Sequence, residues 1–233
     1  MIKRITIYGD SFADPNWEKE RYVHETWYEK LEKQYDEYHN FAFAGTGPHY
    51  SFKEFYQRYE SFNEDDLIVF ILSGQDRINF YVSPSSDDRA DVLKSHEAEF
   101  VNEENMTYAM QTFEQEVLNL NKKNESFLYT ISRLNKCKIC IFFLRSEESY
   151  IGDRLNDTNF YIHKDGLQKV CEDEYINPGE PYVEDNKRNN HLVEENHIVF
   201  YEIIDNFAKG NTNIPSFKKH LLDAPDKREF IYD

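Results

Sequence analysis

The chain has 233 residues, a length that suits one sizeable domain, because a single hydrophobic core stays efficient up to roughly 250 residues. Asp and Glu number 44 against 27 Lys and Arg, and the formal net charge of -17 argues against nucleic acid or an anionic membrane as a partner. No apolar run reaches the roughly 18 residues of a membrane span and no leader-like segment opens the sequence, so we expect a cytoplasmic protein without a membrane span.

Apolar runs that break off in small polar turns predict the strands of a parallel sheet. An open α/β sheet builds its ligand site from such turns, at the carboxyl ends of its strands. The continuous apolar runs at 67–72 and 138–144 are typical of central strands that are covered on both faces. The expected strands are residues 3–8, 38–43, 67–72, 138–144 and, more weakly, 160–162.

Helical spacing of apolar side chains predicts amphipathic helices between these strands. The last helix is expected to end at Gly210, a residue type common at helix C-termini. We therefore expect one α/β domain over residues 1–210 and a polar arm over 211–233, which either packs on the domain or stays mobile. The expected helices are residues 26–34, 52–59, 109–134 and 199–207.

Residues 79–124 form a long polar insertion between two strands. An insertion of this length could cover a ligand site as a lid, and the alternative is an ordinary connecting helix with a solvated loop.

The three cysteines predict neither a disulfide framework nor a metal site. Their number is odd, and no second pair accompanies the CxxC spacing of Cys137 and Cys140. Two residues three positions apart on a strand also point to opposite faces of the sheet. No metal and no cofactor is expected.

The break from the first strand into Gly9-Asp10-Ser11 holds a Ser hydroxyl at the carboxyl edge of the expected sheet. Ser11 is therefore our candidate nucleophile. A Ser is activated by a base within hydrogen-bond reach, which is most often a His. Of the eight histidines, His191 stands on a loop just before the last amphipathic helix, and His197 on that helix is the alternative.

The ordered set of motifs resembles the SGNH (GDSL) hydrolase family over nearly the whole chain. The first block is Gly9-Asp10-Ser11, the second begins at Asn40 and reaches the Gly45 turn, the third is similar to Ser73-Gly74-Gln75-Asp76, and the fifth looks like Arg188-Asn189-Asn190-His191. The resemblance implies a flavodoxin-like three-layer α/β/α sandwich with a parallel sheet of about five strands.

The resemblance also implies hydrolysis of carboxylic esters of carbohydrates, lipids or small acyl groups. Ser11 is then the nucleophile, and His191 is its base and afterwards the acid for the leaving alcohol. The backbone N–H groups of Ser11 and Gly45 are the expected donors to the oxyanion. The expected partner is a small-molecule or glycan ester. The sequence makes no prediction of the oligomeric state.

Two positions depart from the family pattern. Gln75 stands where the third block has Asn, and it offers the same amide on a stem one methylene longer. Arg188 stands where the fifth block has the Asp that orients the imidazole, and a guanidinium cannot accept its N–H. Either Asp185 takes this role through a longer loop, or a backbone carbonyl does and the site is a dyad.

These departures motivate a second hypothesis, a catalytically decayed binding or structural module with the same fold. A third hypothesis, a phosphate or nucleotide site at the first turn, lacks the Gly-rich loop that such sites use. His49 and Tyr50, just after the Gly45 turn, either line the substrate pocket or pack in the core.

Overall fold

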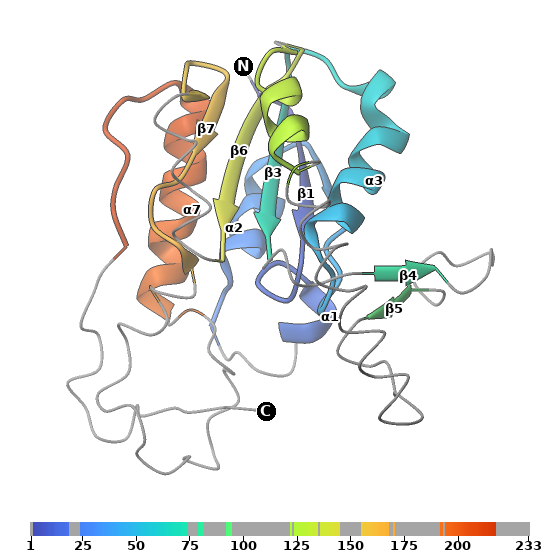
Figure 1. Cartoon of the computed structure of the whole chain (residues 1–233). Helices are drawn as coiled ribbons and strands as arrows, with labels where there is room; N and C mark the ends of the chain where they lie inside the picture. Colours follow the sequence, from blue (N-terminus) through green and yellow to red (C-terminus); the bar gives the residue numbers. More distant parts are fainter. Residues whose placement is uncertain are drawn as a thin grey trace, which may run out of the picture.

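A computed structural model describes residues 2–18, 24–73, 79–81, 92–94, 122, 124–134, 136–144, 155–167, 170, 192 and 194–217. The chain forms an α/β fold around a five-stranded sheet in which every neighbouring pair of strands is parallel (Figure 1). The order across the sheet is β2-β1-β3-β6-β7. Its strands are β1 (Arg4–Gly9), β2 (Glu37–Asn40), β3 (Asp66–Leu72), β6 (Lys138–Phe143) and β7 (Phe160–Ile162).

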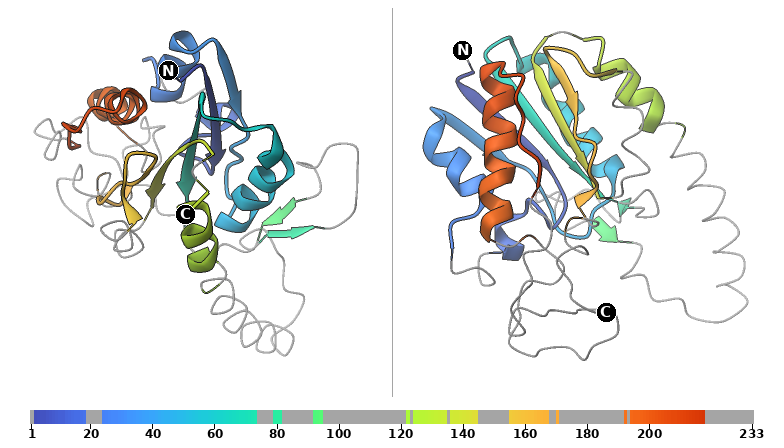
Figure 2. Two further views of the ribbon diagram at one scale, coloured as in Figure 1. Left: turned by 90° about the horizontal axis from the view of Figure 1, so that it is seen from above. Right: turned by 90° about the vertical axis from the view of Figure 1, so that its left-hand side faces the viewer.

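The described helices are α1 (Pro15–Glu18), α2 (Trp27–Gln34), α3 (Pro48–Arg58) and α7 (Glu194–Lys209), and residues 124–131 are also helical. A short 3₁₀ turn, η1 (Tyr59–Ser61), follows α3. Helices lie on both sides of the sheet, with α2 and α7 on one side and α3 and the 124–131 helix on the other (Figure 2). Within the described residues, no helix is long and apolar enough to cross a membrane.

In β1, β3 and β6, alternate residues point into two separate cores, as the period of a strand requires. On one face, Ile7 and Ile71 pack against the α2 and α7 side chains Trp27, Leu31 and Phe200. On the other face, the core is largely aromatic, in keeping with the 16% aromatic content. Its described members include Tyr8, Phe52, Phe55, Phe70 and Phe127.

The fold fixes which end of α7 lies at which edge of the sheet. Lys138, the first residue of β6, donates from Nζ to the Phe207 and Ala208 carbonyls at the end of α7. The helix therefore begins near the carboxyl ends of the strands. The helix ends at Lys209 and is followed by Gly210, whose φ of 75° lies in the left-handed region that is common just after the end of a helix.

The structure corrects several expected boundaries near the sheet edge. The strand expected at 38–43 ends at Asn40, whose Oδ1 accepts the Ala42 N–H at 2.9 Å. The helix expected at 52–59 begins earlier, with Pro48 as its first residue. The loop expected after Ser11 contains the short helix α1, which begins with Pro15. Proline suits both positions because the first N–H of a helix has no partner within it.

The insertion contains a feature that the sequence pattern does not predict, an antiparallel ribbon of β4 (Asn79–Tyr81) and β5 (Val92–Lys94). The expected helix is described only from residue 122 onward, and the remainder of the proposed lid lies outside the described residues. The polar arm is described to Phe217, which is buried against Phe200.

The two described cysteines lie in opposite cores, as their spacing predicts. Cys140 belongs to the core under α7 and Cys137 to the aromatic core. Burial raises the pKa of Cys137 to about 12 and that of Cys140 well above its usual value, because the low-dielectric interior disfavours the thiolate.

Both thiols should therefore resist alkylation while the protein is folded. At about pH 8 each stays protonated and shielded, and only the thiolate reacts with iodoacetamide. Peptide mapping should find Cys137 and Cys140 unmodified in the native protein and fully modified in urea. Fast labelling of either residue in the native protein contradicts the described core.

Candidate active site at the carboxyl edge of the sheet

The candidate site lies where the connections between strands change direction across the sheet. From β1 the chain goes to β2 on one side and then to β3 on the other, so the crossovers diverge at β1 and β3. In open α/β sheets, ligands bind beyond the carboxyl ends of the strands at such a point. Ser11 follows the carboxyl end of β1, and Ser73 follows that of β3.

Strands β1 and β3 approach each other closely just before the turn into Ser11. A Cβ added at Gly9 would lie 2.8 Å from the Ile71 Cβ and 3.0 Å from the Ile71 carbonyl oxygen. Asp10, which is buried, accepts the Phe12 N–H on Oδ1 at 3.1 Å, and its carbonyl accepts the Ala13 N–H. Ser11 therefore sits in a hydrogen-bonded turn with 8% of its surface exposed.

The loop after β2 is held against this turn. The Phe43 N–H donates to the Gly9 carbonyl at 2.9 Å, and the Thr46 Oγ1 approaches the same carbonyl at 3.4 Å. From β3, the Ser73 Oγ donates to the Thr46 carbonyl at 2.5 Å. The segments that follow β1, β2 and β3 thus meet at one edge of the sheet.

Two side chains add further bonds between the first two loops. The Asn40 Nδ2 donates to the Ala13 carbonyl at 2.8 Å. The Asp14 Oδ2 accepts the Ala44 N–H at 2.9 Å. Asn40, the first residue of the second predicted motif, therefore holds the backbone of the Ser11 loop.

Two backbone N–H groups at this edge have no acceptor among the described residues. Neither the Ser11 N–H nor the Gly45 N–H donates a hydrogen bond to any residue that the structure describes. Gly45 has a φ of 78°, a conformation that favours Gly. These are the two N–H groups that the sequence resemblance assigns to the oxyanion.

Three of the expected site residues, Gln75, Asp185 and His191, lie outside the described residues. The chain is described again at Leu192, which is buried in the core under α7. Because α7 begins two residues later, near the carboxyl edge, His191 precedes a helix that starts at the same edge as Ser11.

His197, the alternative base, has a packing position in the structure. It is 1% exposed on α7, and its Nδ1 accepts the Trp27 N–H at the start of α2, at 3.4 Å. Trp27 in turn donates its indole N–H to the Phe12 carbonyl at 3.1 Å. His197 thus connects α7 to α2, and through Trp27 to the residue after Ser11.

Other side chains near the edge pack in the core. Tyr50 is 3% exposed and its ring lies 6.1 Å from that of Phe43, whereas His49 is exposed on α3. Tyr8 is fully buried, and burial raises the pKa of its hydroxyl, which stays protonated. Within the described residues, no group of three His, Cys, Asp or Glu side chains could hold a metal ion.

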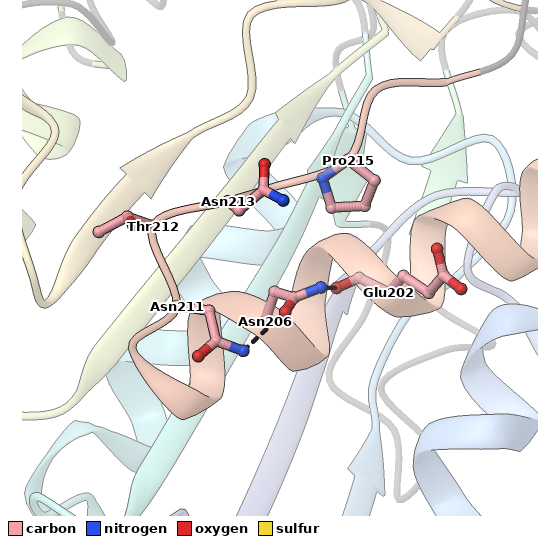
Figure 3. A pocket seen from close by; sticks show the side chains of 6 residues that line it. All are labelled: Glu202, Asn206, Asn211, Thr212, Asn213 and Pro215. Atoms are coloured by element: carbon pink, nitrogen blue, oxygen red, sulfur yellow. Dashed lines mark hydrogen bonds between the residues drawn. The ribbon is translucent and has the colours of Figure 1, made fainter.

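A polar surface pocket lies at the other end of α7 (Figure 3). It is close to the α7 residues whose carbonyls bind Lys138, and hence to the amino edge of the sheet. The described lining of the pocket has no Ser, Cys or His, and the pocket lies at the edge of the sheet opposite to Ser11. Its lining residues are Glu202, Asn206, Asn211, Thr212, Asn213 and Pro215.

Comparison of the chain with models of protein families, with curated proteins and with solved structures found no match.

Replacing Gly9 by Ala should destabilise the protein by about 1–3 kcal/mol, the usual cost of overpacking a core. The new Cβ meets the Cβ and the backbone of Ile71, so shortening the Ile71 side chain cannot relieve the contact. Urea denaturation measures the change. An unchanged midpoint contradicts the close approach of β1 and β3.

Proposed function

We propose that this chain is a serine hydrolase of the SGNH type, which cleaves carboxylic esters through an acyl-enzyme on Ser11. The observation that carries the proposal is the pair of Ser11 and Gly45 N–H groups, which have no acceptor among the described residues and stand on two loops held together beyond β1 and β2. Preorganised donors of this kind stabilise the charge of a tetrahedral intermediate.

We further propose that the whole domain is a flavodoxin-like three-layer α/β/α sandwich. The strand order, with β1 between β2 and β3, supports this assignment. Helices on both sides of the sheet support it as well, since α2 and α7 contribute to one core and α3 to the other.

In the proposed reaction, the Ser11 Oγ attacks the ester carbonyl while His191 takes the hydroxyl proton. The carbonyl oxygen becomes an oxyanion that accepts from the Ser11 and Gly45 N–H groups, with the Gln75 amide as a further donor. His191 then protonates the leaving alcohol, and a water molecule that His191 activates hydrolyses the acyl-enzyme. Either Asp185 or a backbone carbonyl orients the imidazole.

The role of His191 is supported by the direction of α7. The helix starts near the carboxyl edge, and His191 lies three residues before its first residue, Glu194. His197 is the weaker candidate, because its Nδ1 accepts the Trp27 N–H and its side chain lies between α2 and α7.

A fluorophosphonate probe should label Ser11, and replacing His191 by Asn should slow this labelling by roughly 10²–10⁴-fold, the usual contribution of a general base. The matched variant is His197→Asn, because the Asn Oδ1 can replace Nδ1 as the acceptor of the Trp27 N–H. It should be labelled at close to the wild-type rate. Mass spectrometry of the labelled peptides measures both effects.

Turnover of p-nitrophenyl esters from acetate to octanoate, against a Ser11→Ala control, serves as the second readout. If the wild-type protein is neither labelled on Ser11 nor faster than Ser11→Ala, the hydrolase proposal is wrong. A catalytically decayed binding module, to which Gln75 and Arg188 point, then becomes the better account.

A further inference from the structure

Asp14 is a buried acidic residue in the loop that carries Ser11. Only 3% of its surface is exposed, and both carboxylate oxygens accept backbone N–H groups. Oδ1 accepts from Asn16 at 2.9 Å, within the first turn of α1. Oδ2 accepts from Ala44, also at 2.9 Å, across the boundary to the loop after β2.

The bond from Asp14 holds the backbone of Ala44, the residue immediately before Gly45. On that side, the Phe43 N–H is held by the Gly9 carbonyl and the Ala44 N–H by Asp14. On the other side, the Thr46 N–H donates back to the Phe43 carbonyl at 3.3 Å. The direction of the Gly45 N–H is therefore set by fixed neighbours, and Asp14 supplies the only side-chain acceptor among these described bonds.

We infer that Asp14 is a positioning residue, which aims the Gly45 N–H at the oxyanion without touching the substrate. This inference rests on the proposed hydrolase function. A carboxylate suits the role because each of its two oxygens accepts one N–H. An Asn side chain can accept only one of them and turns its own NH₂ toward the other.

The test compares Asp14→Asn with Asp66→Asn. Asp66 is also buried, at 2% exposed, and also accepts a backbone N–H, from Asn63 at 2.6 Å. It pairs with Arg4 at the start of β1 and β3, which is the opposite edge of the sheet. Both variants exchange a buried carboxylate for an amide, but only Asp14→Asn changes the Gly45 loop.

Asp14→Asn should lower kcat by roughly 10–100-fold and leave KM within about twofold of the wild-type value. This loss is smaller than the roughly 10²–10³-fold fall in kcat when an oxyanion donor is removed, because the Gly45 N–H is misdirected rather than lost. Affinity for phenylboronic acid, which forms a tetrahedral adduct with a reactive Ser, should fall in parallel. Asp66→Asn should keep the wild-type kcat and boronate affinity, measured at a temperature where both variants are folded.

Hydrogen exchange of the peptide that spans residues 43–47 gives a readout that does not depend on activity. Exchange there should accelerate in Asp14→Asn and stay at the wild-type rate in Asp66→Asn. If the wild-type protein turns over esters but Asp14→Asn matches Asp66→Asn in kcat and exchange, the positioning role is wrong and the hydrolase stands. If the wild-type protein is not labelled on Ser11, the hydrolase and this role fail together.

Discussion

Strand β1 pairs with β2 along one edge and with β3 along the other. The position of the candidate site depends on this double pairing. Its register aligns Gly9 with Ile71 at the carboxyl end, where only a residue without a Cβ fits. The chain can then turn sharply into Asp10 and Ser11. The point where the connections diverge is thus also the point where Ser11 emerges from the sheet.

Hydrogen bonds join the segments that follow β1, β2 and β3 into one network. Asn40 and Asp14 each bond across the boundary between the first two loops, and Ser73 bonds from β3 to Thr46. Trp27 extends the network to the helices, since its indole donates to the Phe12 carbonyl and its backbone N–H to His197. In the proposed hydrolase these bonds would hold the oxyanion donors in place, because displacing such a donor weakens transition-state stabilisation.

The sheet could be predicted from the sequence because its strands are local patterns. Residues 67–72 and 138–144 are uninterrupted apolar runs, and they correspond closely to β3 and β6. The opposite faces of Cys137 and Cys140 follow from the period of a strand. The role of Asp14 was not predictable in this way, since Asp14 and Ala44 are 30 residues apart and no periodicity links them.

Short elements were missed although their end signals were present. Asp14 followed by Pro15 is a typical start of a helix, and so is Gly47 followed by Pro48, although the spacing of apolar residues predicts a loop at both places. The predicted β2 strand is too long, because the pattern of aromatic residues continues past Asn40 while the Asn40 side chain accepts the Ala42 N–H. The His197 contact with Trp27 joins residues 170 positions apart, beyond the reach of any local pattern.

The central claim is that Ser11, Gly45 and His191 converge at one edge of the sheet. A crystal structure of the protein after reaction with a fluorophosphonate tests it most directly. The account predicts phosphorus bonded to the Ser11 Oγ, with the phosphonyl oxygen about 2.7–3.1 Å from the Ser11 and Gly45 nitrogens. The His191 imidazole should lie within hydrogen-bond reach of that Oγ. A phosphonyl oxygen turned to solvent, or His191 on another face of the molecule, would contradict the account.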